Sequence, residues 1–324
     1  MVIDRPDGRV VVEEVGDGRR RVTVELPGGA QSVETRYSPA LIEATLALGA
    51  PASLCYLLDR HEHAVDVRRL LETVVPAFLD ARALAGGCVL DLLTGSGAWA
   101  VVLAELLPDA TIAAVDPHAA ELAAARLRVV EHGLAGRVQV LEQPSATTLP
   151  RDVGTFQAVT VVRALTLIAP QERARLLQEA WRRLEPGGRL VVVQASHRWF
   201  PVELHVTGLP LLNYLPAGLA LAAARRFSSA ASPTTTWQGL LQAGVRGTTA
   251  GEVARALRAA GDGKPVPVRP ALPGGRGAAD VWHAYSVQGR ASRAKDVVRL
   301  GCRAVEELTR RPFAPDLSLA FEKR

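Results

Sequence analysis

The sequence predicts an α/β fold in which a mostly parallel sheet is covered by helices on both faces. Short apolar runs alternate with longer amphipathic runs between residues 88 and 195, a rhythm that is typical of βαβ units. The apolar runs are nearly continuous, as expected for strands that are buried on both faces. A glycine-rich turn, Gly95-Ser96-Gly97, follows the first run, and ligands bind at such turns in open α/β sheets.

Composition indicates a globular protein with a sizeable core. The chain has 324 residues, of which 48% are hydrophobic and 22% charged, and the formal net charge is +5. No long Lys/Arg block or basic-aromatic repeat accompanies this charge, so nucleic acid is not an expected partner. The 3 widely spaced cysteines favour a reducing compartment without a structural zinc site, and no signal peptide is visible at the start of the sequence. We therefore expect a cytoplasmic protein.

One uncharged stretch, residues 206–224, approaches the length of a membrane span. Pro210, Pro216 and Gly218 interrupt it, and much of the remainder is alanine. Such interruptions favour a buried or interfacial segment. No stable membrane span is expected.

The N-terminal part predicts a small β element followed by helices. Residues 9–15 and 19–26 flank an Asp17-Gly18 turn and form a hairpin, to which residues 31–37 add a third strand. Ser38-Pro39 then caps a helix, and helical periodicity continues through 65–79. We expect a hairpin element over 1–37 and a helical collar over 38–84.

The core follows over residues 85–290. Its strands are expected at 88–93, 111–116, 137–142, 156–162 and 189–195, and its helices at 97–107, 118–133 and 170–185. A Pro-Gly-Gly turn, 186–188, precedes the fifth strand. Residues 197–247 form an inserted cap, and Thr249 with Glu252 makes a capping box before a helix at 253–261. Residues 266–270 and 280–288 are expected to close the sheet as an antiparallel pair, and 291–324 to form a C-terminal helical tail.

The glycine loop fits two cofactors. As G-x-G-x-x-A it matches the dinucleotide fingerprint, and Asp116 at the end of the second strand suits the ribose of either NAD or S-adenosylmethionine (SAM). Asp91, inside the first strand, discriminates between the two. A buried carboxylate would repel a pyrophosphate, whereas the methionine part of SAM carries an ammonium and a sulfonium. The loop is therefore interpreted as a SAM site.

Four signals in order, VLDLLTGSG, AVDPH, FQAVTVVRAL and RRLEPGGRLVVV, make residues 89–194 resemble class I SAM-dependent methyltransferases of uncharacterised bacterial type. The resemblance implies a Rossmann-like seven-stranded sheet with a lid inserted after the fifth strand. It implies SAM as cofactor, with Asp91 near the methionine ammonium, Gly95 and Gly97 under the methionine part, and Asp116 on the ribose. The full set of implied cofactor-binding residues is Asp91, Leu93, Thr94, Gly95, Ser96, Gly97, Asp116, Pro117, Ser145, Ala146, Val162 and Arg163.

The sequence departs from the family pattern at three points. Leu93 stands where glycine is usual, and Gln157 stands where aspartate is usual. Ser145 or Gln143 replaces the acid that commonly meets the adenine amino group. These departures leave open a SAM-fold module that binds without catalysing, and a nicotinamide oxidoreductase is a weaker alternative.

The acceptor site is expected after the fifth strand. Methyl transfer to a hydroxyl needs alignment and a general base. His197, Glu203 and His205, with aromatic neighbours such as Trp199, offer candidate catalytic groups at that position. No metal site is expected, because the three residues lack a clear further ligand. The predicted activity is O-methylation of a small-molecule, glycan or lipid-linked acceptor, and the N-terminal hairpin either pairs between subunits of a homodimer or covers the acceptor pocket.

Overall fold

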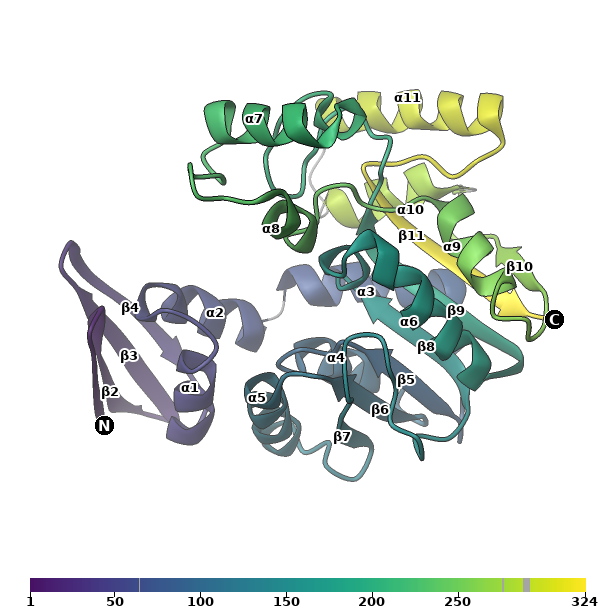
Figure 1. Cartoon of the computed structure of the whole chain (residues 1–324). Coiled ribbons are helices and arrows are strands. Elements are labelled where there is room, and N and C mark those ends of the chain that lie inside the picture. Colours follow the sequence, from purple (N-terminus) through teal and green to yellow (C-terminus); the bar gives the residue numbers. More distant parts are fainter. Residues whose placement is uncertain (64, 276, 288–291) are drawn as a thin grey trace.

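The computed structural model describes residues 1–63, 65–275, 277–287 and 292–324. Two sheets organise the chain, a four-stranded antiparallel sheet at the N-terminus and a seven-stranded mixed sheet that forms the main body. Figure 1 shows the small sheet standing apart from the main body, with helices α1 and α2 between them. The predicted α/β fold class is confirmed.

The N-terminal sheet is larger than the expected hairpin. Asp17 and Gly18 turn the chain with φ of 52° and 69°, values that suit a tight hairpin turn between twisted strands. The inner face of the sheet packs valines, among them Val10 and Val22, on Leu41 of α1 and Leu58 of α2. Its strands are β1 (Val2–Arg5), β2 (Gly8–Gly16), β3 (Arg19–Leu26) and β4 (Gly29–Thr35).

The helical collar follows as α1 (Pro39–Leu46), α2 (Pro51–His63) and α3 (Val65–Phe78). Ser38 caps α1 as predicted, because its side chain accepts a hydrogen bond from the Leu41 amide at 3.2 Å. Helix α3 packs against α4 and α10, so this last helix of the collar forms part of one helical layer over the large sheet.

The large sheet has the strand order β10-β11-β9-β8-β5-β6-β7. Strands β5 to β9 run parallel, and β11 is antiparallel to both β9 and β10. The carboxyl ends of the parallel strands therefore meet at one edge, and β11 begins there beside the end of β9. The strands are β5 (Cys88–Leu92), β6 (Thr111–Asp116), β7 (Val138–Glu142), β8 (Phe156–Val162), β9 (Leu184–Ser196), β10 (Pro265–Val268) and β11 (Asp316–Lys323).

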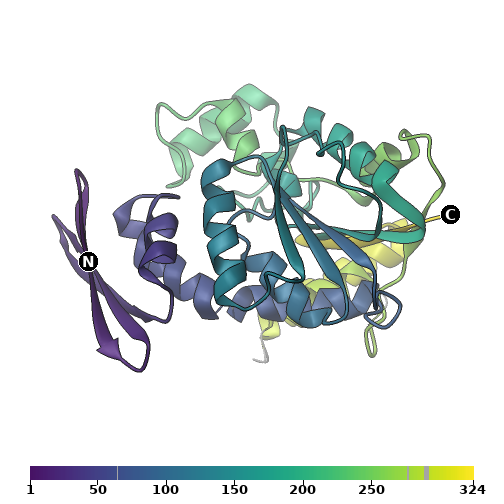
Figure 2. The same ribbon diagram turned by 90° about the horizontal axis from the view of Figure 1, so that it is seen from below.

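Helices cover both faces of this sheet, as Figure 2 shows in the view along it. On one face α4 packs on α3 and α5, and on the other α6 packs on α9. The helices that follow the parallel strands or close the fold are α4 (Ala98–Leu106), α5 (Ala119–Glu131), α6 (Pro170–Arg183), α9 (Ala250–Arg258), α10 (Ala278–Ser286) and α11 (Arg293–Thr309).

The predicted closing strand at 280–288 is wrong. Residues 278–286 form α10, and Val281, Trp282 and Tyr285 are buried on one side of it, a spacing that fits one face of a helix and not the alternation of a strand. Residue 288 lies outside the described residues. The partner of β10 is instead β11, so the end of the expected helical tail is an interior strand of the sheet, next to the edge strand β10.

The Pro-Gly-Gly segment also differs from the expected free turn. Strand β9 already begins at Leu184, and its pairing with β8 shifts from Phe156↔Leu184 to Ala158↔Arg189. Residues 186–188 therefore form a bulge inside the strand, with Gly187 at φ 79°.

The insertion after β9 folds as a small unit with its own apolar cluster. It contains the short helices η2 (Leu212–Tyr214), α7 (Ala217–Phe227) and α8 (Trp237–Gln242). Leu212, Ala220, Ala224, Leu240 and Val245 form its core. In the parts of the chain that the structure describes, no helix is both long and apolar enough to cross a membrane.

Candidate active site

The loop after β5 has the backbone of a ligand-binding turn. Leu93, Gly95 and Gly97 all have positive φ, at 57°, 57° and 81°. Gly97 also needs to be glycine for space, because a Cβ there would lie 2.9 Å from the Ala125 Cβ of α5. At Gly95 an added Cβ would meet only Glu121 Oε2, at 3.7 Å. The loop thus brings backbone close to α5 at Gly97 and leaves space at Gly95.

Asp91 is buried directly beneath this loop. Its Oδ1 accepts a hydrogen bond from the Thr160 hydroxyl at 2.9 Å, whereas Oδ2 has no partner of normal geometry among the described residues. Burial raises the pKa of Asp91 to about 6, although the hydroxyls of Thr94 and Thr160 favour its charged form. A buried carboxylate with one free oxygen fits a cationic group such as the methionine ammonium of SAM.

Asp116 fastens the loop to the end of β6. Its Oδ2 accepts from the Gly95 amide at 2.9 Å, and its Oδ1 accepts from the His118 amide at 2.9 Å. Nδ1 of the exposed His118 ring lies 2.9 Å from the same oxygen. Asp116 thus lies beside the glycine loop, as the sequence predicted, with Pro117 half-buried next to it.

Glu121, which sequence reasoning missed, adds a second carboxylate beside the loop. It lies in the first turn of α5, and burial and the charge of Asp116 raise its pKa. The sequence could have indicated Glu121, because it is an acidic residue five positions after Asp116 and near the start of the predicted helix. Asp116 and Glu121 together provide several acceptors for sugar hydroxyls.

The segment after β7 is held by Gln143. The Gln143 amide nitrogen of the side chain donates to the Ser145 carbonyl, and its Oε1 is buried without a partner among the described residues. The Ser145 hydroxyl hydrogen-bonds Thr148 at 3.1 Å. Ser145 and Ala146 are half-buried. The free polar atom of this segment therefore belongs to Gln143.

Arg163 connects the glycine loop with the end of β9. It follows the buried Val162, adopts φ 56°, and its amide donates to the Val193 carbonyl at 2.9 Å. Its guanidinium stacks on Trp99 of α4, 5.7 Å from the ring centroid, and forms no hydrogen bond or ion pair with any described residue. Burial lowers the pKa of Arg163, and the nearby charge of Asp316 opposes this change.

The three predicted catalytic residues meet at the end of β9, but they differ in what they can do. Around a small cavity of about 10 Å³ lie His197, Glu203, His205 and Asp316. The Glu203 carboxylate accepts hydrogen bonds from the amides of His205, Val206 and Thr207 and from the Thr207 hydroxyl. Glu203 therefore holds the turn that carries His205.

His197 is enclosed. Its Nδ1 accepts from the Trp199 amide at 3.1 Å, the Pro312 carbonyl accepts from the ring, and Phe313 packs edge-on at 4.8 Å. Burial lowers the pKa of His197 to about 4. Both nitrogens are thus engaged in the neutral ring. His205, in contrast, is exposed and its ring has no hydrogen-bond partner among the described residues.

Asp316 and Tyr285 also lie near this site, although neither was predicted as a site residue. Asp316 was expected in a C-terminal helical tail and Tyr285 in a closing strand. Asp316 pairs with Ser196 at the start of β11, and its Oδ2 lies 3.5 Å from Gln194 Nε2. Burial raises its pKa, whereas the charges of His205 and Arg163 lower it. The Tyr285 hydroxyl is buried without a partner in the described chain, and burial raises its pKa.

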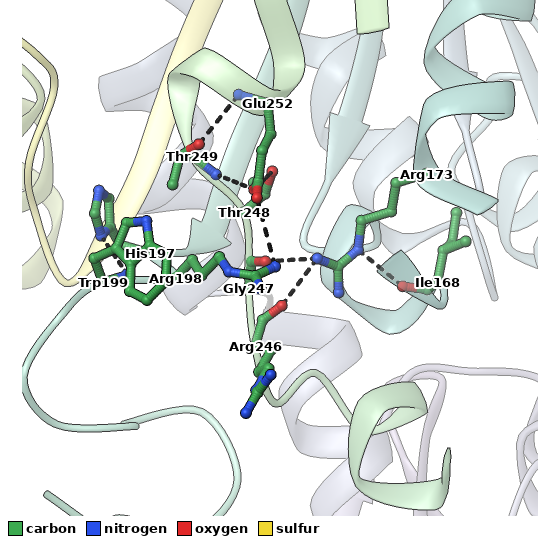
Figure 3. Close-up of polar contacts among 10 residues, drawn as sticks. All are labelled: Ile168, Arg173, His197, Arg198, Trp199, Arg246, Gly247, Thr248, Thr249 and Glu252. Carbon is green, nitrogen blue, oxygen red and sulfur yellow. Dashed lines mark hydrogen bonds and ion pairs between the residues drawn. The ribbon is translucent and has the colours of Figure 1, made fainter. Parts of the chain in front are cut away.

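The two ends of the insertion are joined at the same edge of the sheet. Thr248 N donates to Ser196 O at 2.8 Å, and Arg198 N donates to Thr248 O at 2.9 Å. Figure 3 shows Arg173 of α6 reaching the segment by which the insertion returns to the sheet, where it donates to the Arg246 and Gly247 carbonyls at 3.0 and 2.6 Å. The predicted capping box of Thr249 and Glu252 starts α9 directly afterwards. The cap is therefore anchored beside the cluster of His205 and Asp316.

Comparison with known proteins decides between the two cofactors. Residues 89–188 match the family model described as a methyltransferase domain. These residues form a class I, SAM-dependent methyltransferase domain. SAM is therefore the cofactor of this domain, and the nicotinamide interpretation of the glycine loop is set aside.

The methyltransferase domain has curated relatives of partial length. The demethylmenaquinone methyltransferase of Thermus thermophilus is 41% identical over 106 residues, which cover 33% of this chain and 46% of that protein. The ubiquinone/menaquinone biosynthesis C-methyltransferase of Marinomonas sp. is 31% identical over 113 residues, or 35% of this chain and 44% of that protein. The chain thus spans about half the length of these relatives.

Solved structures show weaker likeness. The SAM-dependent methyltransferase SibL has 18% identity and a TM-score of 0.47, and covers 87% of this chain and 61% of its own. An O-methyltransferase family protein from Burkholderia thailandensis has 19% identity and a TM-score of 0.44, with 71% and 59% covered. These scores add nothing to the assignment of the methyltransferase domain.

Proposed function

We propose that the protein transfers a methyl group from SAM to an oxygen of a small-molecule, glycan or lipid-linked acceptor. The observation that carries the proposal is the position of Arg163. Its guanidinium stacks on Trp99, two residues after Gly97 of the cofactor loop. Its positive charge also lowers the pKa of Asp316, which lies farther along the carboxyl edge of the large sheet. Arg163 thus lies between the cofactor loop and the cluster that contains His205.

The cofactor half of the proposal uses residues that fit SAM. The free oxygen of Asp91 would accept from the ammonium, and Asp116 and Glu121 would accept from the ribose hydroxyls. The half-buried segment of Ser145 and Ala146, with Gln143 beneath it, would border the adenine. When bound, SAM supplies an electrophilic methyl group on a sulfonium centre.

The acceptor half assigns the base to His205. Its ring is free to take a proton from an acceptor hydroxyl, and the Asp316 carboxylate stabilises the imidazolium that results. Glu203 fixes the turn that carries His205 and His197 fixes the start of the insertion, so both are positioning residues. The guanidinium of Arg163 is available to neutralise the acceptor oxygen as its proton leaves.

The test is a set of histidine variants. We expect His205→Ala to lower turnover at least tenfold and to leave the affinity for SAM nearly unchanged, because the base does not hold the cofactor. His197→Ala should mainly lower the melting temperature, and His63→Ala, at an exposed position of α2, should change neither quantity. Full activity of His205→Ala on an identified acceptor would refute the assignment.

A second candidate, methylation of carbon, is favoured by the names of the curated relatives, which are quinone C-methyltransferases. His205 as a base would also support C-methylation, because removal of the proton from a phenolic hydroxyl activates the neighbouring carbon of the aromatic ring. Carbon-13 NMR of a product made with ¹³C-methyl SAM distinguishes the two, since O-methyl and C-methyl carbons resonate in different ranges. A third candidate, a SAM-binding module without catalysis, is excluded by turnover of any acceptor.

A further inference from the structure

Helix α7 of the insertion exposes an apolar side. Ala220 and Ala224 are buried against η2 and α8, whereas Leu219 and Phe227 are 60% and 69% exposed. A surface helix usually directs polar residues outward, so two large apolar side chains in this position need a reason.

Helix α11 repeats the pattern with a better-defined inner side. Arg299 and Arg303 form ion pairs with Asp280 of α10 at 3.6 and 3.7 Å, and Cys302 is buried between the two helices. On the outer side Val297, Leu300 and Leu308 are 68%, 60% and 86% exposed. These three residues follow each other at spacings of three and eight, along one face of a helix.

The two helices lie on the same side of the molecule. Figure 1 shows α7 and α11 along the upper side, with α8 and α10, on which they pack, beneath them. In this view both helices therefore lie over their packing partners, at the same side of the molecule. We name this side the α7/α11 face and define it by its exposed apolar residues, Leu219, Phe227, Val297, Leu300 and Leu308.

Exposed positive charge borders this face. The arginines belong to the last turn of α7 and to both ends of α11. Among the acids of α11, Glu307 is exposed, whereas Asp296 pairs with His283 and Glu306 accepts from backbone amides. Apolar side chains with cationic neighbours and a scarcity of acids are the composition of helices that lie in the interface of an anionic bilayer. The exposed arginines are Arg225, Arg226, Arg293, Arg310 and Arg311.

We propose that the α7/α11 face binds the surface of an anionic lipid bilayer. Leu219, Phe227, Val297, Leu300 and Leu308 enter the headgroup region, and the arginines contact lipid phosphates. Both helices connect to the candidate acceptor site: α7 belongs to the insertion that starts at His197, and α11 leads through Phe313 to Asp316. If the proposed methyl transfer holds, a lipid-borne acceptor reaches the site from this side; bilayer binding itself does not depend on that function.

The test is co-sedimentation of the full chain with vesicles of phosphatidylcholine, with and without one third phosphatidylglycerol. We expect binding only with phosphatidylglycerol, weakening as NaCl rises. The variant Phe227→Ser/Leu300→Ser/Leu308→Ser should bind at least tenfold more weakly at an unchanged melting temperature, because all three side chains are exposed. Val130→Ser, at an exposed position of α5, is the matched control and should bind like the wild type.

Three results would overturn the proposal. The first is the absence of binding to anionic vesicles, and the second is equal binding of the triple variant. The third is a dimer in sedimentation velocity that dissociates in the triple variant, which would assign the α7/α11 face to a second copy of the chain. Loss of methyl transfer in the His205→Ala variant with normal vesicle binding would separate the two proposals.

Discussion

At the residue scale, Asp91 joins two properties that seldom coexist in an apolar core. It is a carboxyl group with almost no exposure, and one of its oxygens has no hydrogen-bond partner of normal geometry among the described residues. In the ligand-free protein a buried carboxylate is destabilising while it is charged, so burial favours the protonated form and raises the pKa of Asp91. Its presence is explained by a ligand that brings a positive charge.

The variant Asp91→Asn tests this explanation through stability. Between the ordinary pKa of 3.8 and the raised pKa of about 6, folded Asp91 holds a proton that the unfolded chain releases, so its contribution to stability declines as pH rises through this window. Asparagine does not titrate. We expect the ligand-free variant to match the wild type near pH 4 and to be more stable by about 2–3 kcal/mol above pH 6, the scale of a two-unit pKa change.

Urea unfolding at several pH values measures this difference. The variant-minus-wild-type free energy of unfolding should grow between pH 4 and pH 6 and then level off. A difference that stays constant between pH 4 and pH 6 would contradict the raised pKa of Asp91 in the folded protein.

At the element scale, local signals predicted most of the structure around the site. The caps at Ser38 and Thr249 were placed correctly, because side-chain capping is encoded within four residues. The need for glycine at position 97 was predicted, but its second role, the contact with α5, depends on Ala125 in a later helix. The sequence pattern indicates that the turn needs glycine. It cannot indicate how closely α5 approaches Gly97, because that distance depends on how the helix packs.

Gly97→Ala separates the conformational and steric roles of this glycine. The new Cβ meets Ala125 and also sits at a positive φ, so we expect a loss of about 2–4 kcal/mol from strain and overpacking. Gly133→Ala is the matched control, with φ 68° and open space around it, and should lose only about 1–2 kcal/mol. Equal losses in chemical denaturation would contradict the close contact with α5.

The base of the insertion gives a second prediction for an element. Arg173 is buried and donates to four carbonyl oxygens, those of Thr166, Ile168, Arg246 and Gly247. Arg173→Met leaves these acceptors without donors, so we expect a loss of at least about 3 kcal/mol. Amide hydrogen exchange should quicken at 246–248, whereas Arg175→Met, exposed on the same helix, should leave exchange unchanged.

At the scale of the whole molecule, the parallel half of the sheet could be predicted and its antiparallel closure could not. Strands β5, β6 and β8 are largely apolar runs, and helices α4 and α5 follow the first two, so these strands are visible locally. Strand β11 inserts between β9 and β10 from the far end of the chain, and nothing near Asp316 signals that pairing. The acceptor-side cluster was incomplete for the same reason, because Asp316 reaches His205 only through this strand.

Truncation tests the importance of β11. Leu317, Leu319 and Phe321 are buried, and Lys323 Nζ donates to the Trp181 and Leu184 carbonyls. Removal of residues 313–324 should therefore abolish cooperative thermal unfolding followed by circular dichroism. Removal of residues 1–7, which takes away only the edge strand β1, should leave a cooperative transition. A cooperative transition in the variant that lacks residues 313–324 would contradict a stabilising role of β11 between β9 and β10.

The most direct measurement is calorimetric titration of the full chain with S-adenosylhomocysteine. We expect one site per chain and an affinity that Asp116→Ala weakens by about 1–3 kcal/mol, the scale of lost hydrogen bonds to a charged group. Glu142→Ala, exposed at the end of the neighbouring strand β7, should bind like the wild type. No binding by the folded protein, or equal affinity of the Asp116→Ala variant, would contradict the placement of SAM at this loop.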